Sequence, residues 1–537
     1  MPTSIGEAAE NKNAQTGVET RIKSRRKPRT TSFSTWLWFC LGSALLLFSY
    51  GANNVALAAW LSPAFLLHFT RRQRWRVWMP LLLVAQIAAS AFQFRGMFPV
   101  IGTAYYLSLV IGGLQTLIPF AADAWLAPRL RGIASTLVFP CTWTVLDYLS
   151  SFGSFGSWGA AGYSQYGELP LLQILSVTGL WGLTFLIGWF ASTCNYAWDE
   201  GFASRPARNA LYLCFAVIAG TILIGGLRLS ALPPSSETVR IASFSKRQVA
   251  TEPSEQLDRL LANKASTEDF TEIRKWAAAV NDDLLMRADR QAQEGAKIVF
   301  WAEGNALVLK QDEAALLAQG SKLAAKDNIY LGMALGVLSP GQSKPLENKF
   351  VVAGPDGKMS MDYYKAHPVP GDEAAMSVTK DGRLQVMETP FGRISAIICF
   401  DGDFPQLLSQ AGALGADIVL DPSNDWRAID PWHTEMASFR AIEQGINLDR
   451  LTSHGLSEAF DYQGRTLAAL DYFHSSDDAM VADLPTRSVR TTYSRFGDWF
   501  AWLTIAGSLA LIVAAFLTGP HVDEFGRGVS RGRAVGN

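Results

Sequence analysis

Eight long apolar stretches limit what this chain can fold into more than any other feature of its sequence. Each is close to the ~20 residues that a helix needs to cross the ~30 Å hydrocarbon core of a bilayer. Many of the chain's tryptophans lie near the ends of these stretches, where an interfacial aromatic belt forms. The stretches predict a polytopic α-helical membrane protein, and they cover residues 33–50, 54–70, 77–94, 103–126, 132–150, 171–197, 209–229 and 499–518.

The positive charges between these stretches alternate along the chain. Arginines and lysines cluster in residues 21–29 and after the second, fourth, sixth and eighth stretches, whereas the short connections between them hold only Arg95. Because connections rich in Lys and Arg stay in the cytoplasm, the pattern places both chain ends inside the cell. The polar segment after the seventh stretch then lies outside the cytoplasm.

The same pattern predicts five regions. We expect a disordered basic tail over 1–32, a seven-helix membrane domain over 33–229, an outer domain over 230–498, an eighth span over 499–518 and a cytoplasmic tail over 519–537. The first stretch is too long for a cleaved signal peptide and is interpreted as a retained anchor. We expect Asp147, near the outer end of the fifth stretch, to be a helix-end carboxylate that reaches interfacial water. The net charge of −1 gives no reason to expect a nucleic-acid partner.

The outer domain alternates between helical and strand-like patterns. Strands are predicted over 239–244, 297–301, 329–337, 349–353, 358–364, 393–399, 417–421, 448–452, 456–460 and 466–470, and helices over 269–294, 312–326, 404–415 and 432–445. Interleaved helices and strands of this kind indicate a layered α/β domain.

Cys399 is the only cysteine in the outer domain, since the other four lie in apolar stretches. Thiols outside the cytoplasm are usually paired, so an unpaired one suggests a chemical role. Cys399 also ends the strand-like run of residues 395–399 and is followed directly by a turn. It is therefore a candidate nucleophile, although a cysteine after an apolar run can equally be a small core residue.

A thiol nucleophile needs a base and a group that stabilises the oxyanion. Glu303 follows one predicted strand and Lys365 follows another. Three strand ends could present Glu303, Lys365 and Cys399 at one edge of a sheet, with the backbone N–H after Cys399 as an oxyanion donor. Taken singly, Glu303 and Lys365 can also be ordinary surface residues.

Several short motifs resemble a known family. Trp301-Ala-Glu-Gly304, Tyr363-Tyr-Lys-Ala-His-Pro-Val-Pro370 and Ile397-Ile-Cys-Phe-Asp401 resemble the Glu, Lys and Cys motifs of the carbon–nitrogen hydrolase (nitrilase) superfamily. Asn424-Asp-Trp426, His433 and Arg440-Ala-Ile-Glu443 resemble a later signature of one branch, the apolipoprotein N-acyltransferases. Gly162-Tyr-Ser-Gln165 and Pro170-Leu-Leu-Gln-Ile174 are similar to that branch's membrane part. The resemblance covers roughly residues 35–518.

The resemblance implies a fold, a location and a reaction. The outer domain would be a nitrilase-like αββα sandwich that faces the periplasm or exterior from the bacterial cytoplasmic (inner) membrane. Cys399 would take an acyl chain from a phospholipid as a thioester and pass it to the α-amine of a diacylglyceryl-cysteine lipoprotein. Glu303 would be the general base, Lys365 would stabilise charge, and Glu373 and Phe400 would support the site. The resemblance implies no cofactor, and we expect a monomer.

This sequence departs from the family pattern in places. Phe400 and Asp401 stand where the family usually has Tyr and Glu, and Gly371-Asp-Glu373 replaces Phe-Gly-Glu. The strand Ile241-Ala-Ser-Phe-Ser245 lacks a Gly-Asn and Gln pattern. Asn447-Leu-Asp-Arg450 and Thr452-Ser-His-Gly455 replace a more basic, Asn-bearing stretch. These changes affect the substrate-binding details more than the chemistry, because all three triad positions are filled.

Three alternatives remain open at this level. The same triad with water as the acceptor would make a membrane-tethered amidase or nitrilase. A chain with altered loops could be a non-catalytic relative that binds lipoproteins. Cys399 with His433 could form a protease-like pair. His433, His454 and His474 have no metal-ligand spacing, so we expect no metal.

Overall fold

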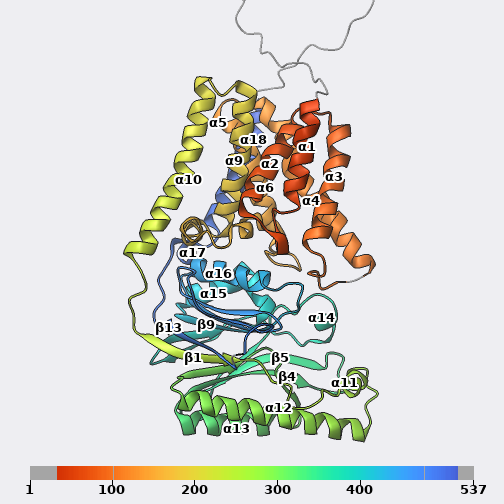
Figure 1. The fold of residues 1–537 in the computed structure, drawn as a ribbon, viewed down its shortest axis with the longest axis vertical. Coiled ribbons are helices and arrows are strands. Elements are labelled where there is room, and N and C mark those ends of the chain that lie inside the picture. The colour runs from red at the N-terminus through yellow and green to blue at the C-terminus, as the bar shows by residue number, and fades with distance from the viewer. Residues whose placement is uncertain (1–32, 101, 477, 518–537) are drawn as a thin grey trace, which may run out of the picture.

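The protein has a helical part and an α/β domain (Figure 1). The computed structural model describes residues 33–100, 102–476 and 478–517. The predicted tails, 1–32 and 519–537, therefore lie outside the described residues. The α/β domain is inserted between α10 (Arg205–Ala231) and the last helix, α18 (Trp499–Leu517).

The helical part contains a helix in each of the eight predicted apolar stretches. The two stretches at 132–150 and 171–197 are divided into short and long pieces. The helices before α10 are α1 (Phe33–Leu46), α2 (Ala56–Thr70), α3 (Trp75–Gln93), α4 (Thr103–Leu126), α5 (Ile133–Thr136), α6 (Val138–Ser150), α7 (Leu169–Leu172), α8 (Leu175–Thr178) and α9 (Leu180–Glu200).

Not all of these helices have the length of a membrane span. Among the described residues, four are long and apolar enough: Trp75–Gln93, Thr103–Arg129, Arg205–Ala231 and Trp499–Leu517. A fifth results if Leu169–Thr178 and Leu180–Glu200, which meet at 116°, count as one broken span. The helices α1 and α2 are apolar but have only 14 and 15 residues. The structure thus supports several apolar helices, and the count of eight spans stays a prediction.

The bend between α8 and α9 has a local cause. Gly179 has a φ of +65°, and a Cβ there would lie 2.4 Å from the Tyr493 ring. Only glycine fits this combination of left-handed backbone and close contact. Tyr493 belongs to α17 (Thr492–Phe496) of the α/β domain, so this break is part of the contact between the two parts.

Charged side chains join helix ends on the side away from the α/β domain. Arg71, directly after α2, donates to both carboxylate oxygens of Asp123 at 2.7 and 2.8 Å. It also reaches Asp199, near the end of α9, at 3.3 Å. The ends of α2, α4 and α9 are therefore joined at one end of the helical part, whereas α10 leads into the α/β domain at the other (Figure 1).

The expectation for Asp147 is wrong. Its carboxylate does not reach interfacial water but is buried in α6. One oxygen, Oδ2, accepts a hydrogen bond from the Ala161 backbone N at 3.0 Å and another from Thr184 Oγ1 at 2.9 Å. Asp147 thus holds the segment after α6 against α9, because a buried carboxylate needs such donors.

The α/β domain contains two mixed sheets packed face to face. One sheet has the order β13-β1-β2-β4-β5-β6, with β3 also paired to β4, and the other has the order β12-β11-β10-β9-β8-β7. The first is covered by α12 (Thr267–Gln293) and α13 (Glu313–Asp327), and the second by α15 (Pro405–Leu414) and α16 (Trp432–Gln444) (Figure 1). This is the αββα layering that the family resemblance implied.

The strands lie close to the predicted positions. Their bounds are β1 (Thr238–Phe244), β2 (Ile298–Trp301), β3 (Ala306–Leu309), β4 (Tyr330–Leu338), β5 (Leu346–Ala353), β6 (Met359–Tyr364), β7 (Val386–Thr389), β8 (Gly392–Ala396), β9 (Ile418–Asn424), β10 (Asn447–Ser453), β11 (Leu456–Phe460), β12 (Thr466–Asp471) and β13 (Met480–Pro485). The strands β3, β7 and β13 were not predicted, nor were the short helices α11 (Ser254–Leu261), α14 (Asp372–Met376) and α17.

The α15–α16 face of the α/β domain rests on the helical part. Glu443 of α16 accepts a hydrogen bond at 2.7 Å from the backbone N of Leu180, at the start of α9. The free N–H groups and positive dipole at a helix start favour such a carboxylate. The six-stranded sheet, which carries Cys399, is therefore the sheet nearer to the helical part (Figure 1).

Candidate active site

The three predicted catalytic residues come from two sheets. Glu303 follows β2 and Lys365 follows β6, both in the seven-stranded sheet, whereas Cys399 follows β8 in the six-stranded sheet. The expectation that they share one sheet edge is therefore wrong. The structure still brings them together, since Glu303 and Lys365 are among the charged groups that most affect the pKa of Cys399.

Lys365 joins two glutamates. Its ammonium Nζ donates to Glu303 Oε1 at 2.8 Å and to Glu373 Oε2 at 2.9 Å. Only 2% of the Lys365 side chain is exposed. Burial opposes the charge of this lysine, but Glu303 and Glu373 outweigh burial and raise its pKa well above the usual value. The two glutamates therefore favour the charged form of Lys365.

Asn348 is a further member of this cluster that sequence reasoning missed. Its Nδ2 donates to Glu303 Oε1 at 2.6 Å and to Glu373 Oε1 at 3.0 Å. Asn348 lies on β5 between Glu347 and Lys349 and is buried. Because its neighbours on the strand are charged as well, the local sequence does not single it out. We call Glu303, Asn348, Lys365 and Glu373 the glutamate–lysine cluster.

The glutamates differ in environment. Burial raises the pKa of Glu303; Lys365 lowers it in part, and Glu373 raises it further. A carboxylate with a raised pKa holds a proton more readily than a free one, as a general base must. Glu373 is 20% exposed in its side chain and also accepts from the Val369 backbone N at 2.8 Å.

Cys399 sits in a turn with unusual backbone geometry. It begins a 3₁₀ turn, Cys399–Asp403, after β8, and its φ is +52°. This left-handed conformation costs roughly 1–2 kcal/mol for a residue with a side chain, so neighbouring contacts must hold it. One of them is a hydrogen bond from the Cys399 backbone N to Asp421 Oδ1 at 2.8 Å.

The surroundings of Cys399 favour the protonated thiol over the thiolate. Burial raises its pKa well above the usual value, and the charge of Glu303 adds to this effect, while Lys365 opposes it. The Sγ atom lies 4.0 Å from the Asn424 carbonyl oxygen. A nucleophilic Cys399 would therefore need a base to remove its proton.

Asp401 ties the cysteine turn to the lysine strand. This buried carboxylate accepts hydrogen bonds from Tyr363 Oη at 2.7 Å and from the His367 backbone N at 2.8 Å. It also accepts from the Ile398 backbone N at 3.2 Å. The residue that departs from the family's usual Glu thus holds the turn and the Lys365 segment together.

Phe400 is buried in an aromatic cluster. Its ring lies 5.4 Å from that of Phe404 and 6.3 Å from that of Trp158, which belongs to the helical part. These contacts fix the residue after the nucleophile. The role of the Phe400 backbone N–H as an oxyanion donor stays a prediction.

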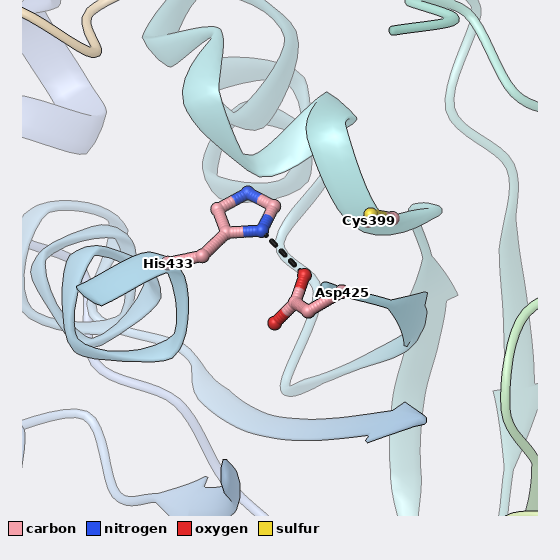
Figure 2. A group of neighbouring side chains, drawn as sticks. All are labelled: Cys399, Asp425 and His433. Atoms are coloured by element: carbon pink, nitrogen blue, oxygen red, sulfur yellow. Dashed lines mark hydrogen bonds and ion pairs between the residues drawn. The ribbon is translucent and has the colours of Figure 1, made fainter. Parts of the chain in front are cut away.

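A second polar cluster also lies near Cys399. The possible metal-ligand atoms of Cys399, Asp425 and His433 lie within 4.8 Å of one another (Figure 2). The His433 ring meets Asp425 Oδ1 at 2.7 Å through Nδ1 and Asp403 Oδ2 at 2.9 Å through Nε2. Arg450 Nη2 approaches the same Asp425 oxygen at 3.1 Å. We call Asp403, Asp421, Asp425, His433 and Arg450 the histidine cluster.

His433 is not free to act on Cys399. Burial would lower its pKa, but Asp403 and Asp425 outweigh burial and the opposing charge of Arg450, and they raise the pKa to about 9. Arg450 Nη2 also lies 2.7 Å from Nδ1, a contact that suits a neutral ring. In either state both ring nitrogens are engaged, so the ring offers neither a free base for the thiol nor a lone pair for a metal.

Two hollows lie in or against the helical part. A pocket of about 300 Å³ is lined by Glu373, by Trp426 and by the α3–α4 connection at Phe98 and Pro99. A cavity of about 590 Å³ lies among α1–α4 and α6, with the loop of residues 153–161 as part of its wall. Its lining is mostly apolar, and its volume falls within the range of ligand pockets.

Comparisons with known proteins agree with this architecture. The family model for carbon–nitrogen hydrolase matches residues 240–493, and the model for the apolipoprotein N-acyltransferase N-terminal domain matches residues 31–193.

Two known relatives that match much of the chain share one name. Apolipoprotein N-acyltransferase from Geobacter metallireducens is 27% identical over 90% of this chain and 95% of its own length. The protein of that name from Bradyrhizobium diazoefficiens is 28% identical over 62% of this chain and 64% of its own. Among solved structures, an amidase from Nesterenkonia sp. covers 47% of this chain and 92% of its own, with 20% identity and a TM-score of 0.35.

Proposed function

Because this chain belongs to the apolipoprotein N-acyltransferase branch of the carbon–nitrogen hydrolase superfamily, we propose that it transfers an acyl chain from a membrane phospholipid to the N-terminal amine of a lipoprotein. The observation that carries the proposal is the glutamate–lysine cluster beside Cys399, built where the α/β domain meets the helical part. Both substrates are anchored in lipid, so a site at this junction suits them.

In the first half-reaction, the Cys399 sulfur attacks the ester carbonyl of the phospholipid. Glu303 removes the thiol proton, and Lys365 stabilises the negative charge that develops on the carbonyl oxygen. The tetrahedral intermediate then expels the glycerol oxygen, to which Glu303 returns the proton. A lysophospholipid leaves, and the acyl chain stays on Cys399 as a thioester.

In the second half-reaction, the free α-amine of the diacylglyceryl-cysteine attacks the thioester carbonyl. Glu303 takes a proton from the amine, the C–S bond breaks, and the sulfur leaves and recovers a proton from Glu303. The product is an amide-linked acyl chain on the lipoprotein. This sequence of steps gives ping-pong kinetics.

Two features of the structure support lipid substrates in particular. The 590 Å³ cavity in the helical part offers apolar space for an acyl chain beside the loop that reaches Asp403. The 300 Å³ pocket borders Glu373 and the α3–α4 connection, which is a short path from the bilayer side to the cluster. An amidase for soluble amides would need neither feature.

The location and topology remain part of the proposal. We propose eight spans, both termini in the cytoplasm, and an α/β domain that faces the periplasm or exterior from the bacterial inner membrane, as a monomer with the predicted domain limits. The ion pairs of Arg71 lie at the helix ends away from the α/β domain, which suits a cytoplasmic side at that end.

A product assay tests the proposed function. Purified protein in detergent receives phospholipid and a synthetic diacylated lipopeptide, and mass spectrometry follows the lipopeptide. We expect one added acyl chain in amide linkage, with an equal amount of lysophospholipid. Release of free fatty acid alone would favour the amidase-like alternative, and the absence of either product would favour the non-catalytic one.

A further inference from the structure

We infer that a loop of the helical part positions the nucleophile. The loop comprises residues 153–161, between α6 and α7, and is called the bridging loop below. The 3₁₀ turn Cys399–Asp403 is called the nucleophile turn. The inference takes the role of Cys399 from the proposed function and adds that Ser157 is a positioning residue for it.

Ser157 makes two hydrogen bonds to one atom of the nucleophile turn. Both its backbone N and its side-chain Oγ donate to the Asp403 carbonyl oxygen, each at 2.8 Å. Ser157 is 2% exposed and Asp403 is 1% exposed. A carbonyl oxygen with both lone pairs occupied by a buried neighbour is held firmly in place.

The hydroxyl of Ser157 is itself oriented by a chain of donors. Because its single proton goes to Asp403, it must accept the hydrogen bond from Tyr163 Oη at 2.6 Å. Tyr163 Oη in turn accepts from Arg440 Nη2, on α16, at 3.0 Å. The chain starts at a cation, and the charge strengthens each successive hydrogen bond. It passes from the α/β domain through the helical part and back to the nucleophile turn.

The nucleophile turn needs such support because Cys399 has a left-handed backbone. Asp421 holds the Cys399 backbone N, and Asp401 holds the middle of the turn against the Lys365 segment. Both anchors belong to the α/β domain. The end of the turn, at the Asp403 carbonyl, is held by Ser157, and this anchor comes from the helical part.

Gly156 shows how close the two segments are. Its φ is +55°, and a Cβ at this position would lie 2.4 Å from the Asp403 carbonyl oxygen. A side chain here would push the nucleophile turn away. The bridging loop also forms a wall of the 590 Å³ cavity. One loop thus separates the space proposed for an acyl chain from the turn that carries the nucleophile.

A matched pair of glycine variants tests the inference. Gly156→Ala introduces the clash, whereas Gly167→Ala places alanine at another left-handed glycine, with φ +87°, that has no atom within 4 Å of its Cβ position. The readout is the rate at which iodoacetamide alkylates Cys399, measured by mass spectrometry of its peptide between pH 6 and 10. We expect ~10-fold slower alkylation in Gly156→Ala, since small misplacements of a reacting atom have large kinetic effects, and the wild-type rate in Gly167→Ala.

Ser157→Ala is a second, milder test in case Gly156→Ala does not fold. It removes the hydroxyl and keeps the backbone hydrogen bond, so we expect a smaller effect, ~3-fold or more, in the same direction. Wild-type alkylation rates and pH profiles in folded Ser157→Ala, or in folded Gly156→Ala, would overturn the inference.

The alkylation assay requires no lipid and no acceptor. Altered alkylation in a protein that transfers no acyl chains would refute the proposed function and leave the positioning role intact. Normal acyl transfer together with unchanged alkylation in the variants would support the proposed function and refute the positioning role.

Discussion

Two buried polar clusters lie near Cys399, and they differ in how completely their polar groups are hydrogen-bonded. In the glutamate–lysine cluster, Lys365 bridges two carboxylates and Glu373 borders an open pocket. In the histidine cluster, both nitrogens of His433 are bound, and the surrounding residues are almost fully buried. Both contain acids and a cation near a thiol, so residue types alone do not distinguish them.

This difference in hydrogen bonding suggests a chemical role for the glutamate–lysine cluster and a structural role for the histidine cluster. Glu303 has a raised pKa and lies beside a thiol that needs a base. His433 also lies near the thiol but has no free nitrogen. Its ring binds Asp403, the last residue of the nucleophile turn, and Asp421 of the same cluster accepts from the backbone N of Cys399, the first residue. We therefore expect the first cluster to transfer protons and the second to keep Cys399 in its left-handed conformation.

The largest effect is expected at Cys399, the residue near both clusters. Cys399→Ala should lower acyl transfer by on the order of 10⁴-fold or more, since loss of a covalent nucleophile removes the whole route. The fold should be kept, because the substitution only shortens a side chain. Transfer close to the wild-type rate, measured with phospholipid and lipopeptide, would show that Cys399 is not the nucleophile.

The next effect should distinguish the two clusters. Glu303→Gln and Lys365→Ala should each lower kcat by at least ~10²-fold, the usual range for loss of a general base or an oxyanion donor. Circular dichroism should confirm that the fold is intact. Near-normal kcat in either variant would make that residue an ordinary buried charge.

Glu373 should show a smaller effect within the same cluster. Glu373→Ala removes one of the two carboxylates on Lys365 and leaves the hydrogen bond to Glu303. We expect kcat to fall about 10-fold, because Lys365 keeps its charge but loses part of its positioning. A loss as large as that of Glu303→Gln would mean that the two glutamates share the role of the base.

The smallest effect on kcat is expected for His433→Gln, whose main effect should be on stability. The pKa of His433 is raised to about 9 in the folded protein, so its contribution to stability is present below pH ~6.5 and is lost as the pH rises through about 9. The Tm of the wild type should fall over this interval, and that of His433→Gln should be lower and change less. A kcat loss beyond ~10² at unchanged Tm would make His433 a catalytic group.

Several site residues could be located from the sequence because they follow the ends of predicted strands. Glu303 lies two residues after β2 and Lys365 directly follows β6, and each strand lies within a few residues of its predicted bounds. Cys399 was placed at a strand end, although β8 ends at Ala396 and a 3₁₀ turn presents the thiol. The prediction of these positions depends only on local periodicity, which a single sequence contains.

Other parts of the site depend on contacts between distant segments. Ser157 meets Asp403 across 246 residues, and nothing in its neighbourhood marks it as part of the site. Asn348, Asp421 and Arg450 are polar residues within buried strands. The sequence shows such residues, but it does not show which other residues they contact. The division of the site between two sheets, and the burial of Asp147, likewise follow from tertiary packing.

The most direct test of the central claim is a search for an acyl chain on Cys399. Wild-type protein and Cys399→Ala are incubated with phospholipid but no lipopeptide, and intact-protein mass spectrometry follows each with and without hydroxylamine. We predict one added acyl group on the wild type, removable by hydroxylamine and absent from Cys399→Ala, that is discharged as an amide when lipopeptide is added. Amide formation by a wild-type protein that never carries the acyl group, or an acyl group that persists on Cys399→Ala, would contradict a thioester at Cys399.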